Sequence, residues 1–273
     1  MQRKNNLRNN PALDVVDTLP HMICFRVTRF CNARCGFCLA PPDGGIHPSA
    51  TLLKERIDWL FQNGVKTIHF CGGEPTIHHD LPELIHYVKS CGKKSKLTTN
   101  GIAMSDDLAD ALAKCNTEVK VSLHGNKEHH DEIVGKIAFE NTTATIRKLG
   151  LKGIPVSVQC TIVKDHITVV DWNIKFCLEN QIKRISFLPF IPRGEGYFNS
   201  EKYELTGAER YHLHSLIRER RRDFSGRIDI RLLDFNTRPI HVVEPDGRVV
   251  LEGSSENRDI VLYTIPQREI VVC

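Results

Sequence analysis

The chain has 273 residues, enough to bury a large core as one α/β unit. Its hydrophobic content of 41% and charged content of 26% are typical of soluble globular proteins. The net charge of +4 argues against dedicated nucleic-acid binding but allows anionic ligands. No apolar run approaches the roughly 20 residues of a membrane-spanning helix. The polar segment 1–20 begins with the basic, Asn-rich residues Met1–Asn10, and these are not followed by the apolar stretch of a signal peptide, so we expect a cytoplasmic protein.

From residue 21 onward, short β-type runs alternate with helical patterns. The expected strands are 22–28, 67–71, 95–99, 118–123, 155–163 and 184–189. The expected helices are 52–62, 81–90, 106–114, 142–149, 169–180 and 206–223. Ser105 is the expected N-cap of the helix 106–114, and a capping box at Thr206 opens the helix 206–223. Further strands are expected at 228–232, 240–244, 248–251 and 260–263, with a hairpin turn at Asp246-Gly247.

Six β-then-α units in series imply parallel strands joined by right-handed crossovers. We therefore predict an α/β fold, a partial (β/α)6 TIM-like barrel over residues 21–200, with ligands at the C-terminal ends of its strands. The helix and strands of residues 201–273 are expected to form a strand-rich extension that caps the barrel.

A cysteine-rich loop follows the first strand. Cys31, Cys35 and Cys38 place three thiolates within eight residues, a spacing that suits one soft metal centre. A four-iron cluster or a structural zinc normally takes four ligands, so one metal position is open for a small molecule. The remaining cysteines of the ten are scattered singly, and we expect no second cluster on a cysteine-rich tail.

A second motif, Cys71-Gly72-Gly73-Glu74-Pro75, ends the second strand. Two glycines there let the backbone approach a ligand closely. The Glu74 carboxylate suits an ammonium group. Because the carboxyl ends of parallel strands meet at one face of a barrel, this motif is expected beside the cysteine loop.

Together these residues resemble the radical S-adenosylmethionine (radical SAM) enzymes. The closest branch contains the molybdenum-cofactor cyclase and peptide-modifying enzymes, here without their C-terminal auxiliary cluster. The resemblance covers about residues 20–200 and extends to Thr98–Gly101, Val121–Gly125, a loop at His130–Gly135 and Phe187–Gly196. It implies one [4Fe–4S] cluster on Cys31, Cys35 and Cys38, with S-adenosylmethionine on the open iron.

The resemblance also implies a set of cofactor-binding residues. Gly72, Gly73 and Glu74 would hold the methionine amino group, Pro75 would fix the turn, and the strand ends would reach the ribose, carboxylate and adenine. The implied set is Phe37, Gly72, Gly73, Glu74, Pro75, Asn100, Ser122, Thr161 and Ile191. On the residues alone, Asn100 equally suits a left-handed turn and Ser122 a backbone hydrogen bond. His124 is expected to be a buried, satisfied imidazole.

The implied activity is reductive cleavage of S-adenosylmethionine, after which a 5′-deoxyadenosyl radical abstracts hydrogen from a substrate. An electron donor such as flavodoxin or ferredoxin is implied as a partner. Arg193, Arg231 and Arg238 favour a small anionic substrate (a nucleotide, sugar phosphate or carboxylate). A ribosomally made peptide is the alternative substrate.

The competing class is a non-catalytic protein in which the three cysteines and either His47 or Cys71 bind structural zinc. The run His78-His79-Asp80 is expected to be exposed and not a metal site, since adjacent histidines point apart on most backbones.

Overall fold

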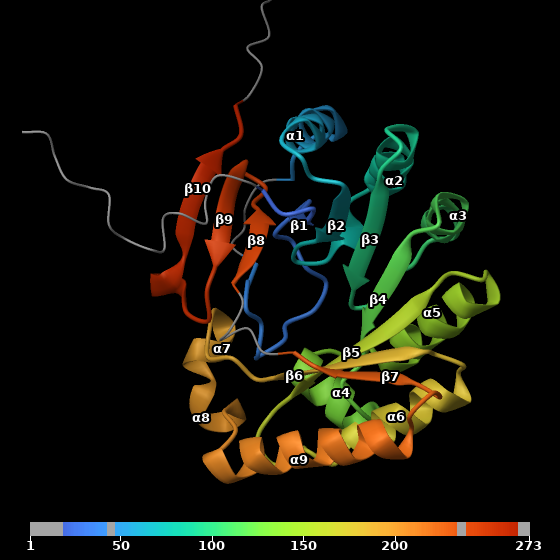
Figure 1. The fold of residues 1–273 in the computed structure, drawn as a ribbon, viewed down its shortest axis with the longest axis vertical. Helices are drawn as coiled ribbons and strands as arrows, with labels where there is room; N and C mark the ends of the chain where they lie inside the picture. The colour runs from blue at the N-terminus through green and yellow to red at the C-terminus, as the bar shows by residue number, and fades with distance from the viewer. Residues whose placement is uncertain (1–18, 43–46, 234–238, 267–273) are drawn as a thin grey trace, which may run out of the picture.

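The computed structural model describes residues 19–42, 47–233 and 239–266. Within them, ten strands form one curved sheet in the order β10-β9-β8-β1-β2-β3-β4-β5-β6-β7 (Figure 1). The strands are β1 (Met22–Arg26), β2 (Thr67–Cys71), β3 (Lys94–Thr99), β4 (Glu118–Ser122), β5 (Val156–Ile162), β6 (Arg184–Pro189), β7 (Asp229–Leu232), β8 (Ile240–Val243), β9 (Arg248–Glu252) and β10 (Ile260–Thr264).

The sheet is parallel from β1 to β7 and does not close, because β7 and β10 remain its two edges. The predicted partial α/β barrel with additional C-terminal strands is confirmed. The predicted boundaries of β2 and β6 coincide with the observed ones. β2 alternates buried and less buried residues, whereas β6 has a short run of four buried residues, so a compact β-type run marks each strand.

The C-terminal strands differ from the expectation that they cap the barrel. β7 pairs parallel with β6, and β8 pairs parallel with β1 through Cys24↔Val242 and Phe25↔Val243. β9 then runs antiparallel between β8 and β10, with the expected turn at Asp246-Gly247. β7 and the group β8 to β10 therefore widen the sheet at its two edges, a long-range pairing that leaves no local pattern.

Helices cover the convex side of the sheet, as α1, α2, α3, α5, α6 and α9 do in Figure 1. The helices are α1 (Ala50–Gln62), α2 (Leu81–Ser90), α3 (Asp106–Cys115), α4 (Lys127–Val134), α5 (Phe139–Leu151), α6 (Val169–Glu179), α7 (Glu195–Phe198), α8 (Ser200–Tyr203), α9 (Gly207–Asp223) and the 3-10 turns η1 (Pro75–Ile77) and η2 (Glu256–Arg258). None of the helices in the described ranges is long and apolar enough to cross a membrane.

One predicted loop is a helix. α4 occupies residues where a loop at His130–Gly135 was expected. The Asn126 side chain accepts a hydrogen bond from the His129 N–H at its start, and Gly135 ends it in the left-handed conformation at φ 68°. Its polar composition hides the helical pattern, although the N-cap and the C-terminal glycine were visible in the sequence.

The strands alternate between two environments. Ile23 and Phe25 of β1 and Ile68 and Phe70 of β2 are fully buried in the core between sheet and helices. Phe25 and Phe70 meet edge to face, with ring centroids 6.2 Å apart. Because successive strand residues face opposite sides, the intervening residues face the concave side. Those residues are largely polar, so the concave side is suited to hold ligands.

Candidate functional site

The loop after β1 carries Cys31, Cys35 and Cys38 across the concave side of the sheet (Figure 1). The backbone N–H of Cys38 donates to the Cys35 carbonyl oxygen at 3.1 Å, and the Ala33 N–H donates to Cys31 Sγ at 3.4 Å. Cys31 and Cys35 pack against a small apolar cluster of Ala33, Ile102, Val134 and Ala138. The loop thus gathers three thiols on one shielded turn.

Burial raises the pKa of all three thiols, and for Cys35 the neighbouring Cys38 and Cys31 raise it further. The Arg26 and Arg29 guanidinium groups act in the opposite direction on the pKa of Cys38. Thiolates so placed need a cation to hold them deprotonated. Three half-buried sulfur donors on one loop therefore fit the iron–sulfur cluster expected from the sequence.

Gly72 and Gly73 are required by the close approach of the cysteine loop. The Gly73 N–H donates to the Thr28 carbonyl oxygen at 2.9 Å, and the Glu74 N–H donates to the Phe30 carbonyl oxygen at 2.8 Å. A Cβ on Gly72 would lie 2.3 Å from the Thr28 oxygen, and one on Gly73 would lie 2.2 Å from the Phe30 oxygen. The two sequence motifs are therefore in direct backbone contact.

The Glu74 carboxylate, 1% exposed, joins two chain segments, the turn after β2 and the end of β3. It accepts hydrogen bonds from the backbone and hydroxyl of Thr76 (3.0 and 2.7 Å), from the Thr99 hydroxyl (2.6 Å) and from the Asn100 backbone (2.7 Å). Burial raises the pKa of Glu74, and these four donors oppose that rise. Pro75 opens the turn η1 that follows. Glu74 thus fixes the ends of β2 and β3 relative to each other.

Asn100, Ser122 and Thr161 end three neighbouring parallel strands, as the sequence suggested. The Asn100 side chain donates to the Asn32 side chain in the cysteine loop at 2.7 Å and accepts from the Ile102 N–H at 2.9 Å. It therefore braces the loop itself. Ser122 is half-buried at the end of β4.

The fourth and fifth strand ends meet through His124. Its ring Nδ1 accepts from the Thr161 backbone N–H at 3.1 Å, and its backbone N–H donates to His130 Nδ1 at 3.2 Å. The expected burial of the imidazole is confirmed, with one ring nitrogen, Nδ1, in a hydrogen bond. Phe37 packs against the His124 ring with centroids 4.9 Å apart. Ile191 is buried in the segment after β6.

An ion-pair network at the edge of the barrel was not predicted from the sequence. Its members are Arg26, Arg29, Arg193, Glu244, Glu252 and Asp259. Arg26 pairs with Glu244 and binds both carboxylate oxygens of Glu252, at 2.7 and 3.0 Å. Arg193 binds both oxygens of Asp259 at 2.7 Å and Glu252 at 3.2 Å. The network fastens β1 and the segment after β6 to β8 and β9, and its partners are too distant in sequence to predict.

This network corrects the expected roles of the arginines. Arg193 is buried and already paired, so it is not available to a substrate. Arg231 pairs with Asp229 at 2.7 Å. Arg238 lies outside the described residues.

The concave side instead offers a small basic cavity of about 160 Å³. Its polar lining includes His69, Lys96, Glu118, Lys120, Arg184 and Arg231. Lys120 donates to the Gln159 side chain at 3.3 Å, and burial lowers its pKa. Alternating polar and apolar residues in β3 and β4 were the signal that would have identified these lysines. A larger hollow of about 1050 Å³ lies among Glu118 and residues 146–157 and 179–184, at the amino-terminal ends of β4, β5 and β6.

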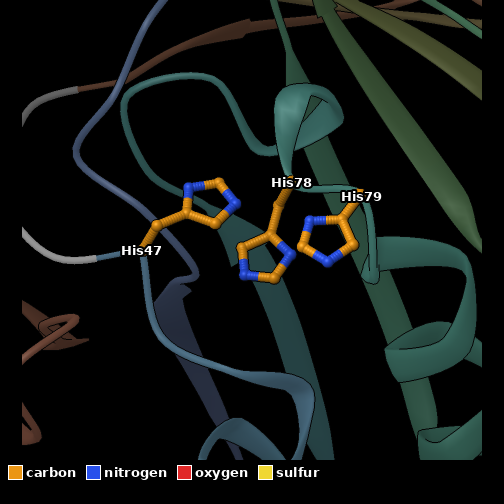
Figure 2. A group of neighbouring side chains, drawn as sticks. All are labelled: His47, His78 and His79. Carbon is orange, nitrogen blue, oxygen red and sulfur yellow. The ribbon is translucent and has the colours of Figure 1, made fainter.

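The expected exposure of the run His78-His79-Asp80 is confirmed for His79 and wrong for His78. His78 is buried, and both rings lie beside His47 with nearly parallel planes (Figure 2). His47 is therefore engaged with these histidines and is not placed as a fourth ligand of the cysteine loop. The neighbouring Cys24 thiol and burial raise the pKa of Cys71.

Comparison with known proteins places these features in a family. Residues 25–173 match the family model of the Radical SAM superfamily. The chain is 31% identical over 180 residues to the Fe-coproporphyrin III synthase of Methanosarcina barkeri, covering 64% of this chain and 45% of that protein. It is 30% identical over 188 residues to a probable GTP 3′,8-cyclase of Sulfurisphaera tokodaii, covering 65% and 58%. The chain thus spans about half the length of these relatives.

The fold also matches solved structures. Crystal structures of Streptococcus suis SuiB, bound to S-adenosylmethionine or to the precursor peptide SuiA, superpose with a TM-score of 0.74. They are 16% and 18% identical and cover 87% and 91% of this chain, and 62% and 67% of SuiB. At this identity the likeness concerns the fold.

Proposed function

Because the chain belongs to the radical SAM superfamily of enzymes, which use a [4Fe–4S] cluster and S-adenosylmethionine, we propose that Cys31, Cys35 and Cys38 hold one such cluster. The observation that carries the proposal is the contact between the three-thiol loop and the Gly72-Gly73 turn. That contact places the three-thiol loop next to the carboxyl-terminal end of β2. When bound, the cluster and S-adenosylmethionine supply a 5′-deoxyadenosyl radical that abstracts hydrogen from a C–H bond.

The strand ends orient the cofactor in this proposal. Glu74 acts mainly by shaping the turn, because its carboxylate already accepts four hydrogen bonds from the chain. The methionine amino group then meets the backbone of Gly72 and Gly73. Ser122 and Asn100 are the polar groups for the ribose and carboxylate.

The apolar side chains complete the cofactor site. Phe37 and Ile191 flank the adenine, and Thr161 borders it from β5. The cluster around Phe37, formed by Ile133, Val163, Phe190 and Tyr203, excludes water from that side.

For the substrate we propose a small anion bound on the concave side. Of the four Lys and Arg side chains that line the basic cavity, Lys96, Arg184 and Arg231 pair with carboxylates. Lys120 contacts an uncharged amide, so a phosphate or carboxylate can take its charge. Ser122 lies two residues further along the same face of β4, about 7 Å towards the cofactor end. An anion on Lys120 therefore directs the rest of a small molecule towards the cofactor.

A peptide substrate is the competing assignment, favoured by the fold likeness to SuiB bound to its precursor peptide. Both substrate assignments require an external one-electron donor such as a flavodoxin or ferredoxin. Zinc on the cysteine loop is the alternative without catalysis.

The cofactor assignment is tested anaerobically. The chain is reconstituted with iron and sulfide, reduced with dithionite and given S-adenosylmethionine, and 5′-deoxyadenosine is quantified. We expect about four iron atoms per chain, 5′-deoxyadenosine formation, and loss of both in Cys35→Ala. Zinc in place of iron, or unchanged cleavage in Cys35→Ala, contradicts the proposal.

The substrate class is tested by offering deuterated phosphorylated and carboxylated small molecules and, separately, deuterated peptides. Deuterium transfer into 5′-deoxyadenosine identifies a hydrogen donor. We expect transfer from a small anion, lost in Lys120→Met and restored in part by Lys120→Arg. Transfer from a peptide that is unaffected by Lys120→Met would overturn the small-anion assignment and leave the cofactor assignment intact.

A further inference from the structure

Three imidazoles from two separate segments meet beside the base of the cysteine loop (Figure 2). His47 precedes α1, while His78 and His79 lie between η1 and α2. Ring centroids are 4.1 Å apart for His47 and His78, 5.5 Å for His78 and His79, and 5.9 Å for His47 and His79. One nitrogen from each ring lies within 4.8 Å of the other two.

The remaining nitrogen of each ring is held by an oxygen atom. His47 Nδ1 lies 3.2 Å from the Thr28 hydroxyl, and His78 Nε2 lies 2.9 Å from the Pro48 carbonyl oxygen. His79 Nε2 lies 3.0 Å from an Asp80 carboxylate oxygen. Metal-binding histidines characteristically donate their outer N–H to such an oxygen, which fixes the tautomer and leaves the other nitrogen with its lone pair.

The ring nitrogens that could bind an ion are therefore His47 Nε2, His78 Nδ1 and His79 Nδ1. Figure 2 shows His47 Nε2 turned towards the other two rings, and Nδ1 of His78 and of His79 on the facing sides of their rings. His78 Nδ1 accepts from the Asp80 N–H at 3.3 Å, which shows that it carries a lone pair and that its present partner is distant.

We propose that His47, His78 and His79 bind one divalent first-row transition metal, with zinc as the best fit. Neutral imidazoles suit zinc, and three of them leave a fourth position for water or another ligand. The ring planes now differ by only 6–13°, so each ring must rotate to aim its lone pair at the ion. His79 is exposed, so its ring has room to turn, although its Nε2 contacts the Asp80 carboxylate.

The position of the site gives it a structural consequence. The Thr28 hydroxyl that meets His47 also accepts the Phe30 N–H at 3.1 Å, in the segment that leads to Cys31. The ion would join the segment before α1 to the turn after β2. It would thereby fasten both ends of the cysteine loop independently of the proposed catalytic function.

The test uses the full chain with its cluster reconstituted, so that the cysteines are occupied. Zinc is added, excess is removed by desalting, and zinc per chain is measured by mass spectrometry together with the melting temperature. We expect one zinc per chain and a higher melting temperature. Separate His47→Ala and His79→Ala variants should each bind at least tenfold more weakly, while His21→Ala, at an exposed histidine, should bind as the parent chain does.

A second arm excludes binding to thiols. The chain carrying Cys31→Ala, Cys35→Ala and Cys38→Ala should retain the zinc, and cobalt bound there should show visible d–d bands without thiolate charge transfer. Loss of zinc in this triple variant, or parent-like zinc binding in folded His47→Ala and His79→Ala chains, refutes the site. Far-UV circular dichroism verifies the fold of each variant.

Discussion

Replacing Gly73 by alanine tests the contact on which the cofactor site depends. The new Cβ would lie 2.2 Å from the Phe30 carbonyl oxygen and 2.5 Å from that of Arg29, whereas real Cβ atoms stay about 3.0 Å or more from such atoms. These neighbours are backbone, so the cysteine loop must retreat by roughly 1 Å, a misplacement that costs on the order of 100-fold in rate. The hydrogen bonds from the Gly73 N–H to Thr28 and from the Glu74 N–H to Phe30 then weaken together, and each contributes about 1 kcal/mol to stability.

The assay measures iron per chain after anaerobic reconstitution and the rate of 5′-deoxyadenosine formation. Because the collision is with the loop that carries the cysteines, both should fall in Gly73→Ala. The control is Gly150→Ala in α5, where a Cβ meets nothing within 4 Å and activity should be retained. A Gly73→Ala chain with full iron content, whether or not its cleavage rate falls, would refute the collision argument.

Three further predictions concern stability. Arg193→Met should lower the free energy of unfolding in urea by about 3 kcal/mol, because it leaves the Asp259 carboxylate without its ion-pair partner. Arg184→Met, which removes a more exposed ion pair, should lower that free energy by under about 1 kcal/mol. Burial lowers the pKa of His129 to about 4, so the unfolded chain binds more protons between pH 4 and 6.5 and stability should fall as pH drops through that window. His129→Leu should reduce this slope in urea titrations at several pH values; an unchanged slope would contradict the assignment. Thr206→Ala should lower the melting temperature by removing the capping box of α9, at about 1 kcal/mol, and an unchanged value would argue against it.

Local patterns were sufficient for most of the chain. The ends of β2, α2 and β6 coincide with those expected, because the apolar pattern of each of these elements lies within a few neighbouring residues. The capping box at Thr206 is present as predicted, with Glu209 reaching back to the Thr206 N–H. The cysteine loop and the glycine turn likewise carry their signal within a few residues.

Only part of the concave side could be predicted from the sequence. Lys120 stands in a clear alternating strand, yet whether it is paired depends on residues of other strands, here Gln159 of β5. Arg193 looked available to a ligand because Glu252 and Asp259 are more than 50 residues away in sequence. Its neutralisation is a property of the folded barrel edge.

By itself, the sequence determined the strand and helix series, the three-thiol loop, the glycine turn and, through their resemblance, the family. Only the tertiary structure decided that β7 to β10 widen the sheet at both edges, that Arg193 is buried in an ion-pair network, and that His47 meets His78 and His79. The physical reason is range: capping and alternation are set by residues within a few positions of one another. Strand pairing, buried charge pairs and ring orientation depend on segments that meet only after the chain has folded.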